Sequence, residues 1–448
     1  MTRTPPKPLP LKPLLAVSLA LVAGNAFSQT ATEAELARRL DLLATELTSV
    51  KAQLTQLQQE RSATSLASPK ETPPATSVAS ATAAPAAQPA VAMSAPAAAA
   101  EPATVLTSYG ELNYSRPTKA SQNAVADVRR FILGFQHRFD AKSKLVTELE
   151  VEHAVSSASD PGEVAVEQAY LEHQLTPTWA ARAGLLLIPA GQLNENHEPT
   201  AFYGVERNFV ETAIIPSTWR EGGIQFVGNF DNGLTVQTGI TTSFNLTKWD
   251  ATSSEGKESP LGSIHQEMAL AKARDLAVFG ALNWRGIPGL LLGGSLFTGN
   301  ATHGQAVAQA RVTLWDLHAR WTPGRWDLST VYARGSIGNT AALNLALIGN
   351  DTLIPKTFDG WYGQAAYKLW SHEDYALSPF VRWEQFNTAR AYADLGPGLT
   401  PAAGVTERVV SLGANFQVSP GIVVKADYQA FRENRDANRV NLGVGWSF

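Results

Sequence analysis

Apolar and polar residues alternate along most of residues 105–448, and this pattern constrains the fold more than any other feature of the chain. The C-terminal segment shows it best, because one set of alternate positions holds Val440, Leu442, Val444, Trp446 and Phe448. The positions between them are mostly small or polar. A period of two residues is typical of β-strands that have one apolar face. Sixteen segments of residues 105–448 fit this description.

The connections between these segments are alternately short and long. The short ones are residues 140–144, 176–179, 231–233, 286–289, 323–324, 371–377 and 419–421, and the longest are residues 190–220, 245–273, 338–357 and 388–406. A soluble β-sandwich also has alternating strands, so the strands alone do not decide. Short turns at one end and long loops at the other are typical of outer-membrane barrels. We therefore predict an all-β fold, a transmembrane antiparallel β-barrel of sixteen strands.

Composition excludes several other classes of protein. The 448-residue chain has no cysteine, so it holds neither a disulfide framework nor a thiolate metal site. Only 17% of the residues are charged and the formal net charge is −4, which makes nucleic acid an unfavourable partner. A closed barrel accounts for the low charge, because lipid covers its outer face and every backbone group is paired within the sheet.

The N-terminal 104 residues differ from the rest. Residues 1–28 have a basic start, a short apolar stretch and a small-x-small site, as a secretory signal peptide does. Residues 62–104 are rich in Ala, Pro, Ser and Thr, which predicts a linker. Residues 105–448 then form the barrel domain. An even number of strands puts the N-terminus and the C-terminus at the short-turn, periplasmic end of that barrel.

Residues 29–61 carry an apolar heptad seam. Its core positions are Leu36, Leu40, Leu43, Leu47, Val50, Leu54 and Leu57. This spacing predicts an α-helical coiled coil in the periplasm, and hence an oligomer, although it does not fix the number of strands. The alternative is a single amphipathic helix that rests on its own domain.

Several motifs of the barrel region resemble the phosphate-selective porin family of Gram-negative outer membranes. They are Glu167–His173 (EQAYLEH), Ala183–Gly184 with Pro189–Gly191, the pair Glu206–Arg207, and the terminal Phe448. The resemblance covers residues 105–448. It implies a homotrimer of sixteen-stranded barrels, a third loop folded into each pore, and a terminal Phe448 that the barrel-assembly machinery reads.

Residues 190–220 are third among the outward-facing connections and become the candidate pore constriction loop. Its charged residues are Glu195, His197, Glu198, Glu206, Arg207, Glu211 and Arg220, of which Arg207 and Arg220 are the candidates for contact with an anionic solute. The alternative is an external cap or a contact with a neighbouring subunit. The alternation also predicts a set of lumen-facing residues, namely Arg130, Arg138, Glu148, Glu150, Arg182, Arg382, Lys425 and Arg439. Each of these could instead be a solvated wall charge.

No catalytic motif is present in the sequence, and we expect neither an enzyme nor a cofactor. His197 and Glu198 are adjacent but have no third partner in sequence, so no metal site is predicted. A serine hydrolase hidden in a barrel remains an alternative.

The leading hypothesis is an outer-membrane porin that allows small hydrophilic solutes or ions to diffuse passively, with anions such as phosphate among the candidates. Its partners would be outer-membrane lipid, two further copies of the chain, the solute and the barrel-assembly machinery. The alternative function is a structural barrel that tethers its periplasmic coiled coil to the cell wall, with peptidoglycan as partner.

Overall fold

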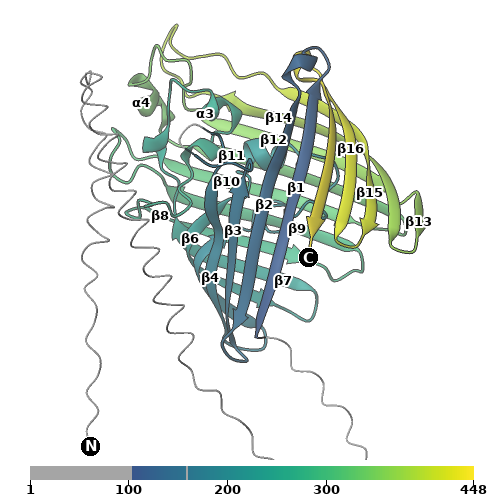
Figure 1. The fold of residues 1–448 in the computed structure, drawn as a ribbon. Coiled ribbons are helices and arrows are strands. Elements are labelled where there is room, and N and C mark those ends of the chain that lie inside the picture. Colours follow the sequence, from purple (N-terminus) through teal and green to yellow (C-terminus); the bar gives the residue numbers. More distant parts are fainter. Residues whose placement is uncertain (1–102, 158–159) are drawn as a thin grey trace, which may run out of the picture. The chain divides into compact units, whose positions relative to one another are not determined.

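The computed structural model describes residues 103–157 and 160–448. The signal peptide, the coiled coil and nearly all of the linker that the sequence predicts lie outside these residues. The described part forms one β-sheet that closes on itself (Figure 1). The first strand pairs with the second and also with the last, so no edge is left open.

All neighbouring strands of this sheet run antiparallel. Their bounds are β1 Thr104–Pro117, β2 Val125–Arg138, β3 Ser143–Glu152, β4 Val164–Gln174, β5 Trp179–Leu187, β6 Arg220–Asn229, β7 Leu234–Thr242, β8 Leu276–Trp284, β9 Leu290–Asn300, β10 Arg311–Trp321, β11 Trp326–Ile337, β12 Thr357–Tyr367, β13 Trp370–His372, β14 Tyr375–Ala391, β15 Glu407–Ser419, β16 Ile422–Phe431 and β17 Arg439–Ser447. β14 pairs with both β12 and β13, so these two segments form one interrupted strand. The predicted barrel of sixteen strands is confirmed.

One predicted connection is wrong. Residues 371–377 were expected to be a turn, but β13 continues the ladder until His372 pairs with Tyr375. The turn is therefore confined to Glu373 and Asp374, and Glu373 has a positive φ of 52°. β13 is only three residues long and its side chains are exposed, so the sequence shows no clear alternation that would predict a strand there.

The connecting segments contain a few short helical elements. These are η2 Ser121–Asn123, the π-helix η3 Val210–Ile214, η4 Leu246–Lys248, α3 Glu255–Glu258, η5 Gly262–Ile264, α4 Thr340–Leu345 and η6 Arg435–Ala437. None of the described helices has the length and apolar composition that crossing a membrane would require.

The outer face of the barrel is apolar. Large side chains such as Leu133, Leu149, Ile240, Leu282 and Leu442 are exposed at alternate positions of their strands. Their neighbours in sequence point into the barrel, so the inward and outward sets follow the predicted alternation. Such an exterior is the one that a lipid environment stabilises.

Part of the interior is filled with an apolar core. The connection from β7 to β8 contributes Phe244 and Leu261, and the inner faces of β8, β9 and β12 contribute Phe279, Phe297 and Phe358. Ile188, Ile214 and Trp219 of the connection between β5 and β6 join the same cluster. The inner wall is therefore not polar all round, and the space that remains for solvent lies elsewhere in the barrel.

Two β-bulges alter the inward set. The register between β1 and β2 shifts after Glu111, and the register between β3 and β4 shifts after Glu148. The unpaired residues are Arg129 and Glu167. A bulge lets two consecutive residues of one strand face the same side, and Glu167 is fully buried inside the barrel next to Gln168, which pairs with Glu148.

Candidate pore constriction

The connection between β5 and β6, residues 188–219, folds against the inner wall at several places. It is third in chain order among the connections at the long-loop end of the barrel. Its π-helix η3 contacts β11, β12 and β14, and its backbone receives hydrogen bonds from side chains on strands far apart in the sequence. Four such anchors define the shape of the loop.

The first anchor is on β15 and β16. The ammonium group of Lys425 donates a 3.0 Å hydrogen bond to the carbonyl oxygen of Phe202 and lies 3.7 Å from the centroid of that phenyl ring. Asn415 donates to the same carbonyl over 3.2 Å. A carboxylate oxygen of Asp427 accepts a 2.6 Å hydrogen bond from the backbone N–H of Val205. The centre of the loop is thus held by charges of both signs.

The second anchor is on β14. Arg382 donates to the carbonyl oxygen of Tyr203 over 3.1 Å, and Glu384 accepts from the backbone N–H of Phe209 over 2.7 Å. The two side chains also form an ion pair of 2.9 Å. Arg382 and Lys425 both belong to the predicted lumen-facing set, and each is only 2% exposed. They therefore bind the loop and are not solvated wall charges.

The third anchor is Glu211, in η3. One of its oxygens accepts hydrogen bonds from the backbone N–H groups of Gln192 and Leu193, 2.5 and 2.8 Å away. The other accepts from the side chains of Asn208 and Tyr362. Burial raises the pKa of Glu211, and these hydrogen bonds oppose the rise. Glu211 lies in the predicted loop, but its buried carboxylate fastens the ends of the loop together.

The fourth anchor joins the loop to β1 and β2. Arg130 donates a 2.6 Å hydrogen bond to the carbonyl oxygen of His197 and forms a 3.0 Å ion pair with Glu111. The imidazole of His197 lies beside the hydroxyl of Tyr109 and the carboxylate of Glu167. Burial favours a lower pKa for His197, but the carboxylate of Glu167 outweighs it and raises the pKa.

The remaining predicted residues are dispersed around the inner wall. Arg182 pairs with Glu172 at 2.7 Å, Arg439 donates to Gln429, and Glu195 accepts from Gln237. Glu148 accepts from Gln168, Glu150 is buried, Glu198 is half-buried, and Arg138 is exposed at the end of β2. Of these side chains, Glu150 lines the same cavity as Arg207 and Arg220, and the others do not.

A cavity of about 400 Å³ lies between the loop and the ends of β2, β3 and β4. Its acidic lining residues are Glu111, Glu150, Glu152, Glu163, Glu206 and Glu267, and its arginines are Arg129, Arg130, Arg207 and Arg220. Acidic groups thus outnumber arginines by six to four. Of the seven predicted loop residues, Glu206, Arg207 and Arg220 line this cavity.

The two predicted anion contacts differ in their surroundings. Arg220, at the start of β6, forms a 3.0 Å ion pair with Glu267. Arg207 donates to the hydroxyl groups of Ser217 and Thr218, and no ion pair involves it within the described residues. Its positive charge is therefore the less compensated of the two. His265 also lines the cavity, and burial lowers its pKa, while the neighbouring carboxylate of Glu267 opposes the shift.

A second cavity, of about 370 Å³, lies near the short-turn end of the barrel. An earlier stretch of the same loop, including Gln192 and Asn196, lines it together with the turn from Arg285 to Leu291. The loop therefore borders space at both the long-loop end and the short-turn end of the barrel.

Reasoning from sequence missed three residues of this interior, namely Tyr109, Arg129 and Glu167. Strict alternation places Arg129 and Glu167 on the lipid face. Glu167 and Gln168 are two consecutive polar residues that interrupt the alternation of β4. Such an interruption is typical of a bulge, and it could have indicated that Glu167 faces inward.

Comparisons with known proteins agree with this architecture. No family model matches the sequence. An uncharacterised protein of Aquifex aeolicus is 28% identical over 351 residues, which cover 76% of this chain and 79% of that protein. OmpF of Salmonella typhi, solved in complex with daunomycin, matches with a TM-score of 0.54 and 13% identity over 77% of this chain and 97% of that chain. The fold is that of the outer-membrane porins. The outer-membrane channel DcaP of Acinetobacter baumannii has the same fold, with a TM-score of 0.51 and 12% identity over 77% of this chain and 97% of its own.

Proposed function

We propose that this protein is a porin of the bacterial outer membrane, through which small hydrophilic solutes diffuse passively. The observation that carries the proposal is a charged cavity beside a loop that is fastened inside a closed, externally apolar barrel. An apolar exterior suits lipid, and a charged interior suits water and polar solutes. The fold shared with OmpF and DcaP supports the same function.

The lining of the cavity supports a passage for polar solutes that carry charge of either sign. Glu150, Glu152 and Glu163 come from the wall at β3 and β4, whereas Arg207 and Arg220 come from the loop and the residue that follows it. Opposite charges on facing sides produce a transverse field that orients polar solutes. Selectivity for anions such as phosphate would depend on Arg207 and Arg220, and the acidic majority of the lining opposes it.

We further propose that three copies of the chain assemble in the membrane with both chain ends on the periplasmic side. The backbone of Phe448 exchanges two hydrogen bonds with Ser108, of 2.9 and 3.0 Å, near the start of β1. Its side chain is 77% exposed. A terminal aromatic side chain in this position is accessible to the barrel-assembly machinery.

Planar-bilayer recording of the purified full-length protein tests the proposal. We expect stepwise conductance in groups of three, and a reversal potential in a potassium chloride gradient that shows weak ion preference. A strong anion preference with saturation by millimolar phosphate would instead support the phosphate hypothesis. Complete absence of conductance from a folded barrel would refute the porin, and capture of peptidoglycan fragments by the same protein would support the tether.

The matched variants are Arg207→Gln and Arg325→Gln. Arg207 lines the cavity, whereas Arg325 is exposed in the short turn between β10 and β11. We expect Arg207→Gln to shift the reversal potential towards cations and Arg325→Gln to leave it unchanged. Equal shifts in the two variants would mean that the cavity does not carry the current.

A further inference from the structure

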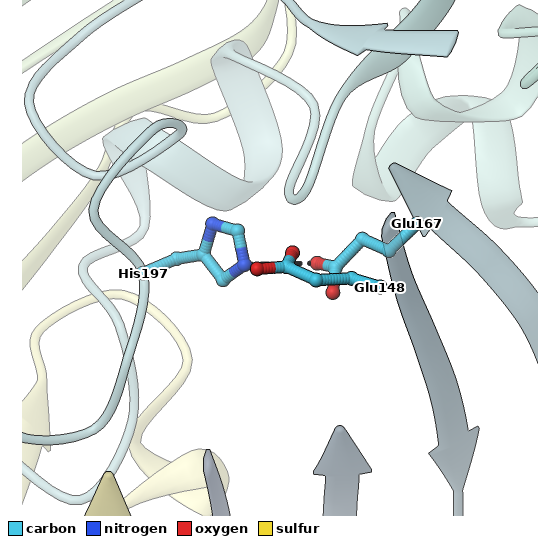
Figure 2. Close-up of side chains that lie close together, drawn as sticks. All are labelled: Glu148, Glu167 and His197. Carbon is cyan, nitrogen blue, oxygen red and sulfur yellow. Dashed lines mark ion pairs between the residues drawn. The ribbon is translucent and has the colours of Figure 1, made fainter. Parts of the chain in front are cut away.

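Three side chains from different elements converge beside the constriction loop (Figure 2). They are Glu148 of β3, Glu167 of β4 and His197 of the loop, and one ligand atom of each lies within 4.8 Å of the others. Glu167 is fully buried and His197 is 3% exposed, while Glu148 is half-buried. Two carboxylates and an imidazole are ligand types that divalent metal ions of the first transition row bind.

The bulge in β4 brings the second carboxylate to this place. Without it, strict alternation counted back from the buried Tyr170 would place Gln168 inward and Glu167 on the lipid face. With the bulge, Glu167 and Gln168 both face inward, and Gln168 donates a 2.5 Å hydrogen bond to Glu148. The backbone irregularity thus adds a carboxylate beside the amide that orients Glu148.

His197 is held with its Nε2 atom towards the carboxylates. Its Nδ1 atom lies 2.8 Å from the carbonyl oxygen of Asn194. A carbonyl oxygen only accepts, so Nδ1 carries a hydrogen. Nε2 lies 2.6 Å from the hydroxyl of Tyr109 and 2.9 Å from Oε1 of Glu167, and it is the ring nitrogen that a metal ion would bind in exchange for these contacts. Metal-binding histidines characteristically donate their other N–H to a carbonyl or carboxylate in this way, which fixes the tautomer and the ring orientation.

The two oxygens of Glu167 have different partners. Its Oε2 atom accepts a 2.8 Å hydrogen bond from the hydroxyl of Tyr109. Its Oε1 atom is buried and forms an ion pair of 2.9 Å with Nε2 of His197. Ligand atoms around a zinc ion, at bonds of about 2.0–2.1 Å, are separated by roughly 3 Å. The two atoms are therefore already spaced as neighbours in such a coordination shell.

We infer that Glu148, Glu167 and His197 form a binding site for one divalent transition-metal ion of the zinc class, with water in the fourth position. Two carboxylates balance the charge of the ion. His197 belongs to the loop and both carboxylates belong to the wall, so a bound ion cross-links the constriction loop to β3 and β4. No pattern in the sequence predicts this site, because the acidic residue next to His197 along the chain is Glu198, which is not part of the cluster.

Zinc binding by the metal-free full-length protein tests this inference. The protein is purified in detergent without an affinity tag, treated with chelator, and titrated with Zn²⁺ against a chromogenic competitor. We expect one zinc per chain, and a loss of affinity of at least about tenfold in both Glu167→Gln and His197→Gln, since each removes a direct ligand. Co²⁺ in place of Zn²⁺ should give a visible absorption band of a four-coordinate site in the wild type only.

The matched controls are Glu152→Gln and His265→Gln, which alter a lumen carboxylate and a lumen imidazole outside the cluster. Both should bind zinc as the wild type does. The mobility of the unheated barrel in gels shows whether the buried variants fold. If they do not, Glu148→Gln tests the site in their place, because it changes a side chain that is only half-buried. Equal zinc affinity in wild type and His197→Gln would overturn the inference, as would no zinc bound by the wild type. Neither result depends on conductance, so the proposed porin function is tested separately.

Discussion

Replacing Glu211 by alanine should release the constriction loop without unfolding the barrel. The carboxylate of Glu211 accepts from the backbone N–H groups of Gln192 and Leu193 and from the side-chain amide of Asn208. Tyr362 adds a longer hydrogen bond of 3.3 Å. Glu211 makes no contact in the ladder between strands, so the effect should remain local to the loop.

The magnitude follows from the donors that lose their acceptor. Three N–H groups are left unpaired in Glu211→Ala, and each costs about 1 kcal/mol or more when it is buried. The free energy needed to open the loop should therefore fall by about 3 kcal/mol. This corresponds to roughly a hundredfold increase in the population of the open loop. Glu211→Gln keeps an acceptor oxygen and should have a much smaller effect.

Native-state hydrogen exchange of the amides of Gln192 and Leu193 measures this opening directly. We expect the exchange rates to rise about a hundredfold in Glu211→Ala and little in Glu211→Gln. The matched control is Glu206→Gln, which alters a cavity-lining carboxylate of the same loop. Unchanged exchange in Glu211→Ala, with the barrel still folded, would refute the assignment of Glu211 as the fastener of the loop.

The same assay has a dependence on pH with a definite sign. Burial raises the pKa of Glu211 in the folded loop, so the folded state binds its proton more tightly than the unfolded state does. The contribution of this group to loop stability is then fully present below the ordinary pKa of a glutamate. It is lost as the pH rises through the raised value. After correction for intrinsic exchange, protection should fall with rising pH in the wild type and stay constant in Glu211→Gln.

Three further predictions concern the pore and the barrel. Arg207→Gln should lower the permeability ratio of chloride to potassium, whereas Arg325→Gln should not; an unchanged ratio in both would remove Arg207 from the solute path. Phe448→Ser should slow assembly into the membrane several-fold in a reconstituted assembly assay, while the unfolding midpoint of the assembled protein stays unaltered. Assembly at the normal rate would contradict the role of Phe448 as the barrel-assembly signal. Gly184→Ala should destabilise the barrel by about 2 kcal/mol or more in denaturant unfolding, because φ is 140° and the new Cβ would lie 2.2 Å from a carbonyl oxygen of β4. Gly324→Ala, at a positive φ with open space around it, should cost less, and an equal loss in both variants would show that the close approach is unimportant.

Sequence alternation predicted the barrel well because the outer face of a membrane barrel has one requirement, which is to be apolar. Lipid imposes that requirement at every outward position, so the period of two persists over all the strands. The candidate constriction loop was found because the length of a connection can be counted directly in the sequence. What happens to such a loop inside the barrel depends on contacts between residues some two hundred positions apart, such as Lys425 with Phe202.

Sequence was less informative about the inner face for a related reason. Arg382 and Lys425 were assigned to the correct face, yet a charge that binds a loop carbonyl and a charge that is solvated look alike in sequence. Register shifts also escape detection, because one additional residue in β4 changes the faces of the residues on one side of it. The role of Glu211 depends on the fold of the loop itself and could not be read from its position.

The interior is asymmetric, and this asymmetry explains where a solute could pass. The apolar core built on Phe279, Phe297 and Phe358 lies on the inner face of β8, β9 and β12, and its side chains offer water no hydrogen-bond partners. The charged cavity lies on the side of β2 to β4, where the two bulges add Arg129 and Glu167 to the inner face. A solute in this cavity lies beside both Arg207 and the wall glutamates. Changes in the lining there should alter permeation, whereas conservative changes within the apolar core should alter stability alone.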